Sequence, residues 1–296
     1  MRAMRRLVRL EMIRPALAAL LCLALAGCAG LRSGSGQPED AGLPPGMSRD
    51  QLLTEIAACH LRRVAQNGDR GATDTVVIAA VQRYKFDVKD MIARSNQLMK
   101  AATKAENRGS LSKLARDSCE TLSALTGVAP SLVRFDATGK VDNTWVAVNG
   151  EMKQGFAQQV IDQLRKEKAV GLLISSPGGS LYEARRLGRY LRANGLRVGV
   201  DGLCTSACVD VLAGGIERYV TVNAKLGIHQ SKVPKALSSH EGGQLSVVAA
   251  ALYLREMGVD DSIALAAAAV PSNSMYWISV PEALKSGLAT KLVAKL

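Results

Sequence analysis

Aromatic residues are scarce in this sequence: three Phe, six Tyr and two Trp make up 4% of its 296 residues. Stacking on nucleic-acid bases needs such side chains, so we expect no nucleic-acid partner. Histidine is also rare, with three residues, and no two cysteines have the CxxC spacing that is typical of zinc sites. We therefore expect neither a metal ion nor a cofactor.

Apolar runs long enough to span a membrane are absent as well. The composition, with 48% hydrophobic and 22% charged residues, excludes a disordered, a collagen-like and a multi-span membrane protein. The apolar run of thirteen residues at Pro15–Gly27 follows an arginine-rich stretch and is typical of a secretory signal. Five of the arginines behind the net charge of +12 lie in residues 1–27 beside one acidic residue. The remaining chain is only mildly basic, at +8, with 33 basic and 25 acidic residues.

The signal ends in Leu25-Ala26-Gly27-Cys28, which resembles the lipobox of bacterial lipoproteins. The resemblance implies that residues 1–27 are removed and that Cys28 carries a lipid anchor. Residues 28–47 are rich in Gly, Ser and Pro, and such a composition indicates a flexible tether. We expect an exported protein that is anchored to a bacterial membrane by its lipid and faces the periplasm. The alternative is an ordinary secretory signal that happens to contain a cysteine.

Four further cysteines are expected to form disulfides, because their number is even and export leads to an oxidising compartment. We pair Cys59 with Cys119 and Cys204 with Cys208. Four residues on a regular helix place two cysteines near the limit for a bridge. Cys204 must therefore lie just before a helix if the second pair is to form.

Residues 48–127 predict a small all-helical domain. Ser48 and Gln51 form a capping-box pattern at its start. A bridge between Cys59 and Cys119 would join the first helix to the last, and His60 is interpreted as a partly buried helix histidine. The later helices are expected over residues 73–84, 87–105 and 110–125.

Residues 128–296 predict an α/β domain, because strand patterns alternate with helix patterns. Repeated strand–helix units imply a parallel sheet with right-handed crossovers. The apolar run Val170–Ser175 suits a strand buried on both faces of such a sheet. The other strands are expected over residues 144–148, 196–200, 219–222, 226–229 and 275–278.

Three segments of this domain carry residues suited to catalysis. Ser176-Pro177-Gly178-Gly179 separates a buried strand from a helix whose start carries Ser180 and Glu183 as a second capping box. Glycines there free backbone N–H groups close to a helix N-terminus. The second segment, residues 202–208, begins a helix and contains Ser206. The third, residues 227–230, ends a strand with His229.

In this order and spacing, the segments resemble the Clp-protease-like branch of the Clp/crotonase superfamily. The closing segment at residues 279–288, with its Pro281-Glu282-Ala283, is also similar, and the likeness covers residues 132–296. The resemblance implies a fold of repeated ββα units and leaves room for a homo-oligomer. The family's ATP-driven partner is not carried over to this chain, because an exported protein has no such unfoldase beside it.

The resemblance also implies roles for individual residues. Ser206 would be the nucleophile, and His229 would be its general base. The backbone N–H groups of Gly179 and Ala207 would form the oxyanion hole. An extended peptide would bind beside the Ser-Pro-Gly-Gly turn by strand addition.

The sequence departs from the family at the residue that orients the histidine. The family has an aspartate there, whereas residues 271–277 of this chain contain no carboxylate. Asn273 or Ser274 could accept the hydrogen bond instead, and Asp210 is another candidate. We therefore expect a lipid-anchored serine hydrolase of the cell envelope, of peptidase type. The alternative is an inactive scaffold of the same fold that binds peptides or proteins.

Two further groups of residues receive structural interpretations. His240 is expected in an exposed loop. Four arginines at helical spacing are interpreted as a solvated helix face, with anionic lipid headgroups as the alternative ligand. These arginines are Arg185, Arg186, Arg189 and Arg192.

Overall fold

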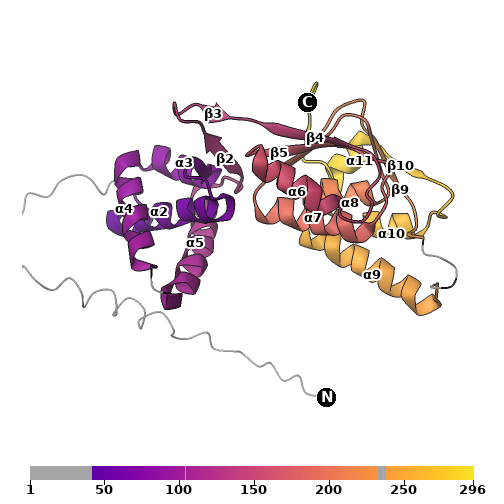
Figure 1. Cartoon of the computed structure of the whole chain (residues 1–296), viewed down its shortest axis with the longest axis horizontal. Coiled ribbons are helices and arrows are strands. Elements are labelled where there is room, and N and C mark those ends of the chain that lie inside the picture. The colour runs from indigo at the N-terminus through magenta and orange to yellow at the C-terminus, as the bar shows by residue number, and fades with distance from the viewer. Residues whose placement is uncertain (1–41, 104, 233–235, 237) are drawn as a thin grey trace, which may run out of the picture. The chain divides into compact units, whose positions relative to one another are not determined.

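The computed structural model describes residues 42–103, 105–232, 236 and 238–296 (Figure 1). The chain divides into two units, residues 1–41 and 42–296, and all described residues belong to the second. The predicted signal peptide, Cys28 and most of the predicted tether lie outside the described residues. Among the residues that are described, no helix is both long and apolar enough to cross a membrane.

The first part of the described chain is mainly helical, as predicted. The capping box at its start is confirmed: the Gln51 N–H donates to Ser48 Oγ at 3.2 Å, and the Ser48 N–H donates to Gln51 Oε1 at 2.9 Å. Helix α2 packs against both α4 and α5. The helices are α2 (Arg49–Asn67), α3 (Thr75–Arg83), α4 (Val88–Ala101) and α5 (Ala105–Thr126).

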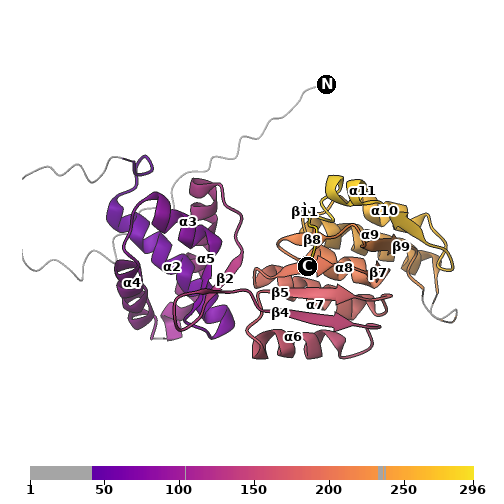
Figure 2. The same ribbon diagram turned by 90° about the horizontal axis from the view of Figure 1, so that it is seen from above.

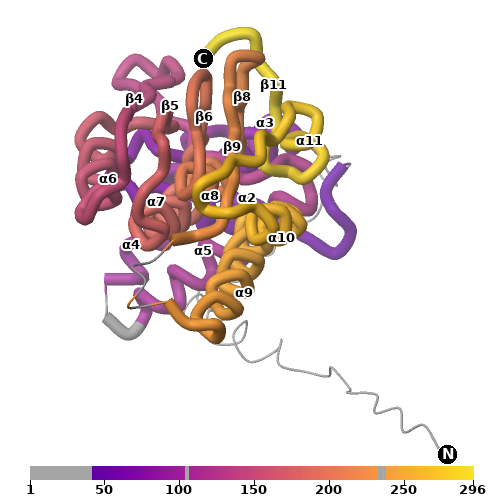
Figure 3. Tube along the Cα trace, turned by 90° about the vertical axis from the view of Figure 1, so that its right-hand side faces the viewer, coloured from indigo at the N-terminus to yellow at the C-terminus, as the bar shows by residue number. Residues whose placement is uncertain are grey.

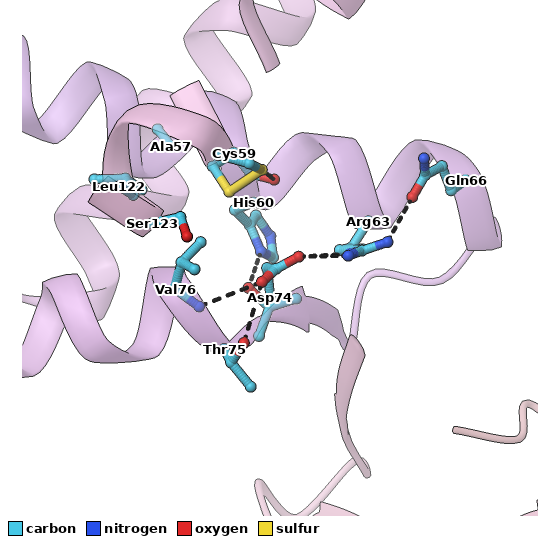
Figure 4. The surroundings of a disulfide bond; sticks show 12 residues. Ala57, Cys59, His60, Arg63, Gln66, Asp74, Thr75, Val76, Leu122 and Ser123 are labelled. Atoms are coloured by element: carbon cyan, nitrogen blue, oxygen red, sulfur yellow. Dashed lines mark hydrogen bonds and ion pairs between the residues drawn. A yellow bond between two sulfur atoms is a disulfide. The ribbon is translucent and has the colours of Figure 1, made fainter. Parts of the chain in front are cut away.

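The predicted disulfide between Cys59 and Cys119 is confirmed (Figure 4). Its Cα atoms are 4.8 Å apart, and it joins α2 to α5. Both cysteines are fully buried in a core with Leu52, Ile56 and Leu122. The bridge and the apolar side chains therefore hold together the same pair of helices.

A small antiparallel sheet adjoins these helices, and the sequence did not reveal it. Its strands are β1 (Ala72–Asp74), β2 (Leu132–Phe135) and β3 (Val141–Asp142), in the order β1-β2-β3. The prediction of one helix over residues 73–84 is wrong at its start. Asp74 ends β1 in extended conformation and accepts a hydrogen bond from the Val76 N–H, so it caps α3. A cap must be non-helical, which moves the helix start to Thr75.

The second part confirms the predicted α/β class. Its main sheet has five strands in the order β11-β8-β6-β5-β4, and every neighbouring pair is parallel. Figure 2 shows β4 and β5 side by side, with α6 and α7 next to them. The strands are β4 (Trp145–Asn149), β5 (Gly171–Ser175), β6 (Arg197–Val200), β8 (Arg218–Val220) and β11 (Lys291–Leu292). The crossover helices are α6 (Phe156–Lys166), α7 (Leu181–Ala193) and α8 (Ala207–Gly214).

Helices α7 and α8 cross at close range. A Cβ atom on Gly214 would lie 2.3 Å from the Cα of Gly188, which is closer than two carbon atoms can approach. Leu187 and Leu212 are fully buried in the same core. The two glycines therefore let the helix backbones touch, and this contact fixes α8 against the sheet.

A second, three-stranded sheet lies beside the start of α8. Strand β9 (Lys225–Ile228) pairs in parallel with β7 (Leu203–Thr205) and antiparallel with β10 (Tyr276–Ile278). Strand β7 was not predicted, because residues 202–208 were read as the beginning of a helix. It has three residues, too few for a hydrophobic alternation to stand out.

The remaining helices follow β9 and β10 along the chain. They are α9 (His240–Glu256), α10 (Ser262–Ala268) and α11 (Val280–Lys285). Figure 3 shows α9 and α10 adjoining each other. The prediction that His240 lies in a loop is wrong, because it is the first residue of α9; its exposure is as expected. Ser239 caps this helix by accepting from the Gly242 N–H at 2.9 Å.

Candidate active site

Ser206 occupies a sharp elbow between β7 and α8. Its backbone has φ 55° and ψ −127°, in a region that residues other than glycine seldom adopt. Such a conformation costs about 1–3 kcal/mol and persists only where the surroundings enforce it. The Ser206 N–H donates to the Gly227 carbonyl of β9 at 2.8 Å, which fixes one side of the elbow. The side chain is half-buried and lines a pocket.

The Ser-Pro-Gly-Gly turn packs directly on this elbow. Gly178 and Gly179 have φ of 100° and 134°. A Cβ atom on Gly178 would lie 2.7 Å from Ser206 Cβ and 2.7 Å from the Thr205 carbonyl oxygen. Only glycine therefore allows the turn to approach the serine this closely. The role of Gly178 was missed at the sequence level, although the glycine pair itself was noted.

Backbone bonds hold the turn on both sides. Met152 N–H donates to the Gly178 carbonyl, and Ser180 N–H donates to the Met152 carbonyl, each at 2.8 Å. On the other side, Ser176 exchanges backbone bonds with β7, and its buried hydroxyl accepts from the Gly178 N–H at 3.1 Å. Ser176 and Met152 are thus supporting residues that sequence reasoning missed. Met152 carries no sequence signal, because its backbone does the pairing.

Two backbone N–H groups next to Ser206 have no hydrogen-bond partner among the described residues. They belong to Gly179 and Ala207, the two predicted oxyanion-hole donors. Ala207 is the first residue of α8, where helix N–H groups have no intrahelical acceptor. Amide donors that are held in place and unbonded can stabilise a developing oxyanion. The oxyanion-hole assignment stays a prediction.

His229 follows β9 directly and lines the same pocket as Ser206, with a volume of about 780 Å³. Its Nδ1 atom is buried and has no hydrogen-bond partner in the part of the chain that the structure describes. The pocket's other titratable residues include Arg185, Asp210 and Lys232. Among the described residues, no three His, Cys, Asp or Glu side chains form a group that could hold a metal ion.

The three candidates for orienting His229 lie in different settings. Asn273 and Ser274 are exposed and precede β10, and neither shares a hydrogen bond with His229. Asp210 lies on α8 and receives a hydrogen bond from Arg185 Nε at 3.0 Å. Burial raises the pKa of Asp210, and the Arg185 guanidinium opposes that rise. The carboxylate of Asp210 is therefore engaged by Arg185 instead of His229.

The interpretation of the α7 arginines as a solvated helix face holds for Arg186 and Arg189, which are exposed, and is wrong for Arg185 and Arg192. Arg185 and Arg192 are half-buried, because both reach α8, where Arg185 bonds to Asp210 and Arg192 to the Ala213 carbonyl. Each arginine has a hydrogen-bond partner: Asp210 for Arg185, Gln158 for Arg186, Glu256 for Arg189, and the Ala213 carbonyl for Arg192.

Glu183 does not complete the second predicted capping box. Ser180 does cap α7, accepting from the Glu183 N–H at 3.4 Å. The Glu183 carboxylate instead accepts from the N–H groups of Gly155 and Ala157 at 3.1 and 2.9 Å. It thereby caps the start of α6, whose own N-cap residue Gly155 has no side chain to do so.

The predicted disulfide between Cys204 and Cys208 is confirmed, with Cα atoms 5.2 Å apart. Cys204 lies in β7, before the helix, which is the placement that the short spacing requires. Cys208 lies in the first turn of α8. The bridge therefore spans the elbow, with Ser206 midway between its two ends.

Comparison with known proteins adds a likeness in fold. No protein-family model matches the chain, and no curated protein matches it in sequence. Among solved structures, the chain is similar to ClpP1 from Listeria monocytogenes, at 19% identity over 51% of this chain and 92% of that one, with a TM-score of 0.41. A point mutant of the same protein matches at 20% identity and the same TM-score, over 51% of this chain and 91% of that one. The α/β class itself stands on the sheet order and strand pairings described above.

Proposed function

We propose that this protein is a serine hydrolase of peptidase type. The observation that supports this most is the setting of Ser206. It sits on a strained strand–helix elbow, in one pocket with His229. The N–H groups of Gly179, in the turn that packs on this elbow, and of Ala207, at the start of α8, have no hydrogen-bond partner among the described residues. A nucleophile, a base and oxyanion donors at one pocket are the components of acyl transfer.

In the proposed reaction, Ser206 Oγ attacks the carbonyl carbon of an amide bond while His229 takes the hydroxyl proton. The oxygen of the resulting tetrahedral intermediate receives hydrogen bonds from Gly179 and Ala207. His229 then donates the proton to the leaving amine, and an acyl-serine forms. Water, activated by the same histidine, hydrolyses that ester and restores Ser206.

The proposed enzyme lacks a carboxylate on the far side of its histidine. In serine proteases, loss of an ionised orienting group costs about four orders of magnitude in rate. Nδ1 of His229 is buried and has no hydrogen-bond partner among the residues that the structure describes, and Asp210 is engaged by Arg185. We therefore propose a slow hydrolase, with the amide or hydroxyl of Asn273 or Ser274 as the group that reaches His229 when substrate binds.

The same missing partner favours a second candidate function. A scaffold that binds peptides needs the pocket and the free N–H groups but no oriented base. In that case the glycine turn serves only to bring its backbone close to Ser206, and an extended peptide binds beside this turn by strand addition.

Labelling with a fluorophosphonate separates the two functions. The wild-type protein should be modified at Ser206, because only an activated hydroxyl attacks such a reagent at neutral pH. Ser206→Ala should abolish labelling. Ser231→Ala is the matched control and should label like the wild type. Ser231 lines the same pocket, but its hydroxyl forms a hydrogen bond of 2.9 Å with the hydroxyl of Ser246. A folded wild-type protein that never labels would establish the scaffold.

We also propose that Cys28 anchors the mature chain to a membrane through a lipid, with the α/β domain in the periplasm. The proposal is supported by the lipobox pattern at residues 25–28. Cys28→Ala should release the protein from membranes or leave the precursor uncleaved. If that variant still sediments with membranes after a high-salt wash, the anchor is not at Cys28.

A further inference from the structure

The disulfide between Cys204 and Cys208 encloses the proposed nucleophile. The two cysteines are four positions apart in sequence, and both have 0% exposure. Ser206, between them, has the positive φ of the elbow. A covalent link therefore joins the strand before the strained residue to the helix after it.

Each end of the link is anchored in a different element. The backbone of Cys204 pairs with Leu226 of β9 on one side and with Ser176, the residue after β5, on the other. Its position is therefore fixed from both sides. Cys208 belongs to the first turn of α8, where helices fray most easily. The disulfide thus ties the first turn of α8, which also carries the Ala207 N–H, to the firmly held strand β7.

Without the link, the elbow has a route to relax. A serine with positive φ lowers its energy by rotating to negative φ, and a freed first turn of α8 would permit that rotation. The rotation would move Ser206 Oγ relative to His229 and would turn the Ala207 N–H at the same time. The bond from the Ser206 N–H to the Gly227 carbonyl holds only the strand side of the elbow. The bond from the Val209 N–H to the Ser206 carbonyl, at 3.0 Å, lies within the first turn of α8 and would move with that turn.

Stabilisation of the whole fold is a weaker account of this bridge. The entropy that a disulfide removes from the unfolded chain grows with the length of the loop it closes. The sequence separation is 4 for this bridge and 60 for Cys59–Cys119. A bridge over so short a loop acts mainly on its immediate surroundings.

We infer that Cys204 and Cys208 are positioning residues for Ser206, whose disulfide holds the elbow in the geometry that nucleophilic attack requires. The inference rests on the proposed hydrolase function. It adds that Ser206 reacts at its full rate only in the oxidised, bridged protein. The full burial of both sulfur-bearing residues makes the bridge a permanent part of the site, closed once when the chain folds.

The test compares the two disulfides of the chain as matched variants. Cys204→Ala with Cys208→Ala should slow fluorophosphonate labelling of Ser206 by about 100-fold, the order of loss that a displacement near 1 Å produces. Cys59→Ala with Cys119→Ala should lower the melting temperature but leave the labelling rate of the folded protein unchanged. Rates are expressed per folded molecule, so a bridge that serves stability alone would not change them.

A second double variant guards against a packing effect. Cys204→Val with Cys208→Ala refills part of the lost volume without restoring the bridge, and its labelling should be slow as well. Labelling of either variant at the wild-type rate overturns the inference. Failure of both variants to fold also overturns it, because the bridge would then be needed for the fold. If the wild-type protein itself does not label, the proposed function fails, and this inference fails with it.

Discussion

Each of the two parts of the molecule contains a histidine whose Nδ1 atom is buried, and the two histidines differ in the hydrogen bonding of that atom. His60 on α2 is buried, and its Nδ1 shares a hydrogen bond with Thr73 Oγ1 at 3.0 Å. His229 lines the pocket of the α/β part, and its Nδ1 has no partner among the described residues. A bonded buried ring stabilises a fold, whereas an unbonded one beside a pocket retains the capacity to act on a ligand.

The surroundings of His60 extend this contrast (Figure 4). Arg63 lies on the same helix and forms an ion pair of 2.7 Å with Asp74, both side chains being almost fully buried. Asp74 also accepts from the N–H groups of Val76 and Ser131. Charge and donors match within this cluster, so we interpret it as structural. Around Ser206, by contrast, the backbone N–H groups of Gly179 and Ala207 and the Nδ1 of His229 have no hydrogen-bond partner among the described residues.

The largest expected effect comes from exchanging the two histidines for glutamine. His229→Gln should slow labelling of Ser206 on the order of 10⁴-fold, the upper range for loss of a general base. His60→Gln should leave labelling unchanged, because an amide can keep the bond to Thr73. The measurement is the labelling rate, with melting curves as the control for folding. Equal losses in the two variants would remove the functional distinction between the two parts.

The next effect concerns the buried ion pair. Asp74→Ala should lower the free energy of unfolding by about 3–5 kcal/mol, because it leaves the Arg63 charge buried without a partner. The control is Asp117→Ala, which breaks the exposed pair between Lys113 and Asp117 on α5 and should cost only about 0.5 kcal/mol. Urea unfolding measures both. A small loss for Asp74→Ala would mean that water reaches Arg63 and that the cluster is not the structural counterpart of the site.

The two disulfides should differ by about 2 kcal/mol in what they contribute to stability. On the chain-entropy scale, a loop of separation 60 gives about 4 kcal/mol and one of separation 4 about 2 kcal/mol. Unfolding of the two double-alanine variants tests this order. If removing Cys204–Cys208 lowers the free energy of unfolding more than removing Cys59–Cys119 does, the short bridge stabilises the whole fold. That result would contradict the local role inferred above.

How far the sequence predicts this molecule depends on the range of the interactions. Both disulfides, the α/β class and the approach of the Gly178–Gly179 turn to a serine segment follow from local patterns and from a family resemblance. Strands β1 and β7 do not, because no hydrophobic pattern marks them and only their pairing defines them, as between Thr73 of β1 and the distant Val133. Arg185 and Arg192 of α7 were misread for the same reason: their partners, Asp210 and the Ala213 carbonyl, lie 25 and 21 positions away in sequence.

The candidate site shows the same division. Ser206 and His229 were singled out by their motifs, and the absence of a carboxylate near residue 273 predicted that the histidine would lack its usual partner. The support given by Ser176 and Met152 could not be foreseen, because it depends on backbone pairing with residues far away in sequence, such as that of Met152 with Gly178. The ion pair between Arg185 and Asp210, which engages Asp210 so that it does not orient His229, could not be foreseen either, because the two residues lie 25 positions apart.

The smallest expected effect is a pH dependence that belongs to the structural histidine. Burial lowers the pKa of His60 below its ordinary value of about 6.5. The unfolded chain therefore binds a proton at His60 at a higher pH than the folded protein does. By linkage, the stability that the neutral ring allows is fully present above about pH 6.5 and is lost as the pH falls toward the folded-state pKa.

Urea unfolding between about pH 7.5 and pH 5.5 should accordingly show a free energy that declines with acidity, and His60→Gln should flatten that decline. The control is His240→Gln, because His240 is exposed at the start of α9 and bonded only to Gln244. That variant should keep the wild-type slope. If His240→Gln flattens the curve and His60→Gln does not, the buried ring is not the titrating group. The contrast between a structural and a functional histidine would then rest on His229 alone.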